Sequence, residues 1–414
     1  MDGALRGELR HRVLGVAAGL ALAFPLATVS LFGARALRLW RKALLSAFVL
    51  LVVLGSVELA VRAFDLRAIS AAELEPDPIL GHARRPGRGG LDEWGFRNLE
   101  RPERVDIVCV GDSQTYGDNI PYEDTWPQAL SRCSGRSVYN LSVGGYGPLQ
   151  HVVLTERGLE LHPRVAVVGF YLGNDLSDAH RFAGLEHWAD LRAPELVYSP
   201  PNDLGRREAR SLNLAMALLD GLQEHSRLAG AFAQRIKLQL KVNPALRVLF
   251  KGAESSSSFE RGRISTHFAS FDRLPSVDLA RPQVRDGMRI TGICLDRMQA
   301  ACRARDVEFV VLLLPSKEAV YARLLEEAGD TLGDGLRALS IAEKAASEAL
   351  LELLRARGVR TVDVTSALVE ALRDDVACWP PNSDGHFNPQ GCEVLARELW
   401  LELAELFETE SGQR

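Results

Sequence analysis

The chain has 414 residues, 47% of them hydrophobic, and its 49 basic and 54 acidic side chains give a net charge of −5. This length and apolar content suffice for one large α/β domain with an added subdomain. The absence of a basic excess argues against nucleic acid as a partner, and six cysteines in so long a chain do not form a disulfide framework.

Two apolar runs lie near the amino terminus. Residues 13–32 carry no charge, and residues 43–61 are rich in leucine and valine with Glu58 as the single acidic side chain. Either run is long enough to cross a bilayer, although the first could instead be a signal-like extension. The basic stretch between them, residues 35–42, is expected on the cytoplasmic side. We therefore predict a membrane anchor within residues 1–62, formed by one or two transmembrane helices. The membrane would be a bacterial-type inner or cytoplasmic membrane, and the catalytic domain would be periplasmic or extracellular.

Residues 63–103 are predicted to link this anchor to the main domain. They contain Pro76, Pro78 and Pro86, followed by a glycine- and arginine-rich patch at 87–90. Such a composition is typical of linkers and turns.

The first strong structural signal is an apolar run at 105–110 that stops at Gly111-Asp112-Ser113. A buried strand ending in a glycine turn places Ser113 at the carboxyl end of that strand, where open parallel sheets bind ligands. A serine hydroxyl is a useful nucleophile only when a base takes its proton and donors stabilise the oxyanion. Alone, such a tripeptide is more often part of a turn or a helix cap than of a catalytic site.

The sequence that follows alternates between strand-like and helix-like segments. Strands are predicted at 137–141, 165–170, 308–314 and 360–364, and helices at 125–133, 149–161, 284–303, 341–357 and 389–407. This alternation predicts an α/β domain over residues 104–408, with a parallel sheet of about five strands between two helical layers. The rhythm lapses between about 185 and 280. We interpret that stretch, with its helical pattern at 212–251, as an insertion.

A second chemical signal lies near the carboxyl end, where Asp384 is followed two residues later by His386. A carboxylate beside an imidazole fixes its tautomer and stabilises the imidazolium, which is what a general base for Ser113 requires. A turn before the last helix is the alternative for this segment alone.

Four blocks in this order resemble those of the SGNH or GDSL hydrolase superfamily: Gly111-Asp112-Ser113, Gly144-Gly145, Gly173-Asn174 and Asp384-Gly385-His386. The resemblance implies a three-layer α/β/α, flavodoxin-like fold with Ser113, His386 and Asp384 as catalytic triad. It also implies an oxyanion hole made by the backbone N–H groups of Ser113 and Gly145 and the side-chain amide of Asn174, with Gly144 as the alternative glycine. The spacing of two between Asp384 and His386 resembles that of membrane-linked polysaccharide acetylation proteins.

The function implied is that of a serine esterase or deacetylase working through an acyl-serine intermediate. Its expected substrates are acyl esters, in particular O-acetyl groups of a cell-envelope carbohydrate. Two alternatives stay open: an O-acetyltransferase to a polysaccharide, and a noncatalytic envelope-binding or scaffolding protein that keeps the fold. The histidines show no metal-binding spacing and no phosphate-cradling loop occurs, so neither a metal nor a cofactor is expected.

Three further residues could support the site, two through a disulfide and one through a contact with the substrate. Cys378 and Cys392 flank the Asp384–His386 segment, and a disulfide between them would hold the base in place. Lys317 is either an ordinary lysine at a helix start or a contact for an anionic group of the substrate.

Overall fold

The computed structural model describes residues 42, 44–46, 48–49, 74–87, 90–198, 258–262 and 264–408. Residues 42, 44–46 and 48–49 are helical and belong to one compact unit, and all the others belong to a second. Within the described residues, no helix combines the length and apolar character needed to span a bilayer. The predicted spans at 13–32 and 43–61 lie outside this part of the chain, apart from residues 44–46 and 48–49.

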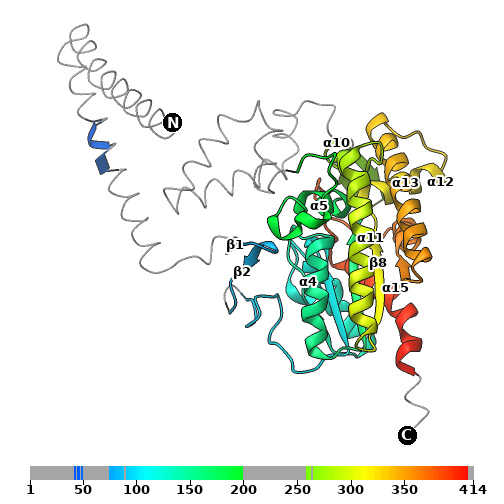
Figure 1. Ribbon diagram of the computed structural model, residues 1–414. Helices are drawn as coiled ribbons and strands as arrows, with labels where there is room; N and C mark the ends of the chain where they lie inside the picture. Colours follow the sequence, from blue (N-terminus) through cyan, green and yellow to red (C-terminus); the bar gives the residue numbers. More distant parts are fainter. Residues whose placement is uncertain are drawn as a thin grey trace. The chain divides into compact units, whose positions relative to one another are not determined.

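Five parallel strands form the central sheet of the second unit (Figure 1). They are β3 (Ile107–Gly111), β4 (Val138–Asn140), β5 (Val165–Tyr171), β8 (Glu308–Leu314) and β9 (Arg360–Asp363). Their spatial order is β4-β3-β5-β8-β9. This is the order of flavodoxin-like sheets, in which ligands bind at the switch point between the first and third strands, here β3 and β5. The predicted parallel sheet is confirmed.

Both faces of the sheet are buried. Along β3, Val108 and Val110 enter one hydrophobic core while Ile107 and Cys109 enter another, and β5 and β8 alternate in the same way. The first core is closed by α4 (Pro148–Gly158), α11 (Pro282–Arg303) and most of α13 (Asp334–Ala356). The second is closed by α3 (Trp126–Ser134), α12 (Lys317–Glu327), α14 (Thr365–Arg373) and α15 (Pro389–Glu408). Near-continuous apolar strands are what a sheet covered on both faces requires.

Several elements were not foreseen from the sequence. A β-hairpin, β1 (Leu74–Asp77) with β2 (Gly81–Arg84), lies inside the predicted linker, and a second, β6 (Ser258–Arg261) with β7 (Ile264–His267), lies inside the predicted insertion. Helices α2 (Ser113–Tyr116), α5 (Asp175–Phe182) and α10 (Ser270–Val277) were also missed. Three short 3₁₀ segments complete the described elements: η2 (Tyr122–Asp124), η3 (Leu159–Leu161) and η4 (Glu186–Leu191). The helical pattern at 212–251 lies outside the described residues.

The hypothesis of a disulfide between Cys378 and Cys392 is wrong for this structure. Both side chains are free thiols and both are buried. Burial raises the pKa of each thiol to about 12, so the reactive thiolate is disfavoured at both positions.

Candidate active site

Ser113 occupies the first position after the turn that ends β3. The side chain of Asp112 caps the short helix α2 by accepting a hydrogen bond of 2.8 Å from the backbone N–H of Gln114. Gly111 and Gly169 are register neighbours on β3 and β5, and a Cβ on either would lie within 2.5 Å of the Thr115 hydroxyl. The two glycines therefore let α2 sit directly against the sheet, which fixes Ser113 above the switch point.

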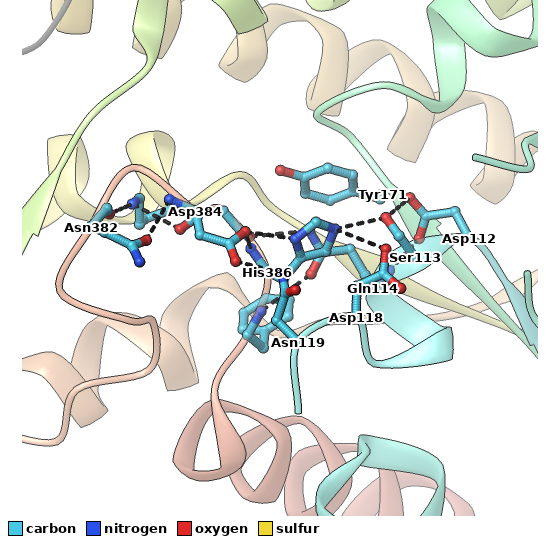
Figure 2. A network of polar contacts seen from close by, with 12 residues as sticks. Asp112, Ser113, Gln114, Asp118, Asn119, Tyr171, Asn382, Asp384 and His386 are labelled. Atoms are coloured by element: carbon cyan, nitrogen blue, oxygen red, sulfur yellow. Dashed lines mark hydrogen bonds and ion pairs between the residues drawn. The ribbon is translucent and has the colours of Figure 1, made fainter. Parts of the chain in front are cut away.

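The structure brings the serine, the histidine and the aspartate together, although Ser113 and His386 are 273 positions apart (Figure 2). The Oγ atom of Ser113 lies 2.9 Å from Nε2 of His386, and Nδ1 of His386 lies 2.6 Å from Oδ1 of Asp384. These are the contacts by which an imidazole can take a proton from the serine while the carboxylate holds its other nitrogen.

His386 and Asp384 each stabilise the charged form of the other. Burial lowers the pKa of His386, but the hydrogen bond and charge of Asp384, with smaller contributions from Asp118 and Asp112, raise it above its usual value. Burial raises the pKa of Asp384, and its hydrogen bond to His386 and the charge there outweigh this, so its pKa is lowered. Both directions favour an ionised aspartate and a basic imidazole.

The loop that carries Asp384 and His386 has no regular secondary structure, and side chains from elsewhere hold it. Gln114 donates to the backbone carbonyl of Gly385 at 3.1 Å. Lys317, the first residue of α12, is fully buried and donates to the carbonyls of Asn382 and Asp384 at 2.8 and 3.0 Å. The same ammonium donates to the carbonyl of His267 on β7.

These contacts correct the substrate-contact hypothesis for Lys317. Its ammonium is 0% exposed and hydrogen-bonded to protein carbonyls, so it cannot reach an anionic substrate group, although it does begin a helix. Its contacts tie α12, the β6–β7 hairpin and the loop of the aspartate together.

An ion pair between a partly exposed arginine and a buried carboxylate lies against the same loop. Arg273 on α10 pairs with Glu318 at 2.9 Å and donates to the Tyr171 hydroxyl at 2.8 Å. A Cβ on Gly385 would lie 2.0 Å from a terminal nitrogen of Arg273. The residue between Asp384 and His386 therefore has no room for a side chain while Arg273 keeps these partners.

The loop after α2 contacts the acid and the base as well. The Nδ2 atom of Asn119 donates to Oδ2 of Asp384 at 2.7 Å, and Oδ2 of Asp118 lies 4.0 Å from Nε2 of His386 (Figure 2). The Asp118 side chain is 37% exposed. This carboxylate therefore adds negative charge on the side of the imidazole that faces Ser113.

Of the two candidate glycines of the oxyanion hole, Gly144 lies beside the nucleophile, because a Cβ on it would lie 3.7 Å from Cβ of Ser113. A Cβ on Gly145 would instead meet the His82 ring at 3.6 Å, and Gly145 has a φ of +83°, a conformation that favours glycine. Their carbonyls are bound by His82 of β2 at 3.1 Å and by Arg181 at 3.2 Å. Neither of the two N–H groups donates to any acceptor in the described part of the chain.

Asn174, the third predicted oxyanion donor, follows β5 and precedes α5. Its Nδ2 atom donates to Asp178 at 3.0 Å. Burial raises the pKa of Asp112, in the serine turn, to about 6.

Sequence reasoning missed several residues that shape the site: Gln114, Asp118, Asn119, Arg273 and, in its actual role, Lys317. All of them contact the triad loop through tertiary packing, and none has a recognisable spacing to Asp384. The available signal was proximity in sequence to the serine block: Gln114 follows Ser113 directly, and Asp118 and Asn119 come shortly after it.

No family model and no curated protein matches this chain. Among solved structures, a putative lipolytic protein of the G-D-S-L family from Desulfitobacterium hafniense has 9% identity and a TM-score of 0.34, with coverage of 72% of this chain and 98% of that one. A G-D-S-L family member from Veillonella parvula has 10% identity and a TM-score of 0.33, covering 72% and 97%. A putative acylhydrolase from Bacteroides fragilis has 10% identity and a TM-score of 0.32, covering 73% and 88%.

Two of these three neighbours are described by the family designation that the motifs of this chain resemble. Identities and TM-scores this low say nothing about activity. The case for chemistry therefore rests on the geometry around Ser113, His386 and Asp384.

Proposed function

We propose that this protein is a serine esterase of the SGNH type, which removes acyl groups through an acyl-serine intermediate. The observation that supports the proposal most is the unbroken hydrogen-bonded series from Ser113 Oγ to His386 Nε2 and from His386 Nδ1 to Asp384 Oδ1, at 2.9 and 2.6 Å. A hydroxyl, an imidazole and a carboxylate in this sequence are the groups that acyl transfer requires.

In the first half of the proposed reaction, His386 takes the hydroxyl proton as Ser113 attacks the ester carbonyl. The new C–O bond places negative charge on the carbonyl oxygen. The N–H groups of Ser113 and Gly145 and the amide of Asn174 would stabilise it. One hydrogen of the Asn174 amide stays with Asp178. The other hydrogen would donate to the oxyanion.

When the tetrahedral intermediate collapses, His386 returns the proton to the departing alcohol and the acyl group remains on Ser113. A second acceptor then attacks with the same base. Water as acceptor completes hydrolysis, whereas a sugar hydroxyl completes acyl transfer. Both outcomes use the same three side chains, and the resemblance to polysaccharide acetylation proteins keeps the transferase as the second candidate.

We propose an O-acetylated carbohydrate of the cell envelope as substrate and a membrane anchor within residues 1–62, with the catalytic domain on the outer side. The substrate rests on the Asp384-Gly385-His386 spacing that resembles the polysaccharide-linked proteins. The location rests on the apolar runs at 13–32 and 43–61 and the basic residues between them.

The test is to follow the acyl group. The full chain in detergent is incubated with 4-nitrophenyl acetate, with and without an acceptor oligosaccharide, and acetate and acetylated sugar are measured separately. We expect acetate release that Ser113→Ala abolishes. Acetylated sugar formed at the expense of acetate would assign the transferase, and no Ser113-dependent release from any ester would overturn the enzyme in favour of the scaffold.

A further inference from the structure

The carboxylate of Asp384 receives its hydrogen bonds from two different parts of the fold. Oδ1 accepts both from Nδ1 of His386 at 2.6 Å and from the backbone N–H of His386 at 3.1 Å. Oδ2 accepts from Nδ2 of Asn119 at 2.7 Å. Within the described residues, Asn119 is the side chain that supplies the donor to this second oxygen (Figure 2).

The backbone at Asn119 is held in an unusual conformation. Its φ is +69°, in the left-handed region that asparagine, aspartate and glycine tolerate better than other residues. Because the cost of this conformation must be offset by the surroundings, a residue kept there next to a reacting group deserves a functional explanation.

Arg97, from the segment before β3, fixes the same loop. Its NH1 atom donates to the carbonyls of Tyr116 and Gly117 at 3.1 and 2.7 Å, and its NH2 atom donates to the carbonyl of Ile120 at 2.6 Å. Its guanidinium also lies 5.2 Å from the centre of the Tyr116 ring. Three carbonyls around Asn119 are thus bound to one cation, which sets the direction in which the amide points.

We propose that Asn119 is a positioning residue of the proposed esterase, which fixes the rotamer of Asp384 by binding Oδ2 so that Oδ1 stays aimed at His386. The inference rests on the proposed function. Without the bond to Oδ2, only the two hydrogen bonds at Oδ1 would oppose rotation of the carboxylate about its Cβ–Cγ bond. With Asn119 in place, the loop that follows the nucleophile also aligns the acid. One short segment of the chain therefore carries Ser113 and positions Asp384, which in turn orients His386.

Two substitutions separate this role from a structural one. Asn119→Gly removes the amide and suits the positive φ, so the loop keeps its conformation. Asn119→Asp keeps the size and also tolerates this φ, but it replaces the donor with a negative charge facing Asp384. Asp306→Gly is the matched control, because Asp306 also has a positive φ, of 56°, in an exposed turn just before β8.

We expect kcat for 4-nitrophenyl acetate to fall about tenfold in Asn119→Gly, because a carboxylate that turns leaves the imidazole less well aligned with Ser113. It should fall further in Asn119→Asp, with KM within about threefold of the wild type in both variants. The added charge in Asn119→Asp also raises the pKa of His386, so the acidic limb of the kcat/KM profile moves to higher pH. That upward displacement is not expected in Asn119→Gly, and Asp306→Gly should match the wild type.

Activity within twofold of the wild type in both Asn119 variants, with an unmoved acidic limb, would overturn the positioning role while leaving the esterase intact. Equal losses in both variants without a displaced limb would also overturn it, because they indicate general disruption of the loop. Absence of any Ser113-dependent hydrolysis in the wild type would instead overturn the proposed function itself.

Discussion

The two halves of the candidate triad are held in place by different means. Ser113 follows a strand whose five residues are all buried and paired with β5 in register, so main-chain hydrogen bonds of the sheet determine where it lies. His386 and Asp384 lie in a loop without regular structure and depend on side chains from distant segments, above all Gln114, Lys317 and Asn119.

This difference separates substitutions that act on chemistry alone from those that act on placement. Changing the nucleophile leaves the sheet untouched. Changing a side chain that supports the loop displaces the base, and a displacement of about 1 Å from a productive geometry costs about a hundredfold in rate. The site should therefore be far more sensitive to distant substitutions on the side of the base than on the side of the serine.

The largest expected effect comes from the triad itself. Ser113→Ala and His386→Ala should each lower kcat for aryl acetates by at least about a thousandfold, and the double variant should lose little more, because the residues act as a unit. Steady-state kinetics of the three variants would check this. Losses that multiply in the double variant would show that the two side chains work independently.

The next largest loss of activity is expected for Gly385→Ala, which changes the loop that carries Asp384 and His386 but none of the three triad side chains. Its methyl group would meet Arg273, which cannot withdraw without leaving Glu318 and Tyr171. We expect a fall in kcat of about tenfold to a hundredfold. The same substitution made in an Arg273→Met background should cost less, and equal losses in both backgrounds would contradict the proposed collision.

Lys317→Met should reduce stability as well as activity. It removes the donor to the carbonyls of Asn382, Asp384 and His267, and unsatisfied buried acceptors are costly. Urea unfolding should show a loss of roughly 2–4 kcal/mol. Lys344→Met, at an exposed position on α13, serves as control and should change stability by less than about 0.5 kcal/mol. Equal stability of the two variants would refute the role given to Lys317.

Asp118→Asn should have the smallest effect, visible in the pH profile. Removing this negative charge, 4.0 Å from Nε2 of His386, lowers the pKa of His386. Since the base works when it is neutral, the acidic limb of kcat/KM should move to lower pH. Asp190→Asn, at a distant exposed carboxylate, should leave the limb in place. A limb that is unmoved or displaced upward in Asp118→Asn would contradict this electrostatic account.

The sequence predicted what local patterns determine. The strand at 308–314 was placed at its observed bounds, and the strand leading to Ser113 was placed to within two residues at its start and one at its end, because continuous apolar runs bounded by turns mark buried parallel strands. The start of helix α12 at Lys317 was foreseen as one interpretation of that lysine, and Ser316 caps it, but the extent of the helix was not predicted. The β1–β2 hairpin was hidden in a proline-rich stretch that resembled a linker.

The residues of the candidate site were predictable to the extent that they fall in the matched blocks. Asn119 and Lys317 could not be found in this way, because their contacts with Asp384 join positions 265 and 67 residues apart. A buried lysine among carbonyls looks, in sequence, like any lysine at a helix start. Only the fold brings such a residue to its partners.

Activation of the Ser113 hydroxyl by His386 can be tested by covalent labelling. The full chain is treated with a fluorophosphonate at neutral pH, and the modified peptide is identified by mass spectrometry. We predict a single adduct on Ser113, absent from Ser113→Ala and formed far more slowly in His386→Ala. No adduct, an adduct on another residue, or labelling of Ser113 at the same rate without His386 would contradict the account.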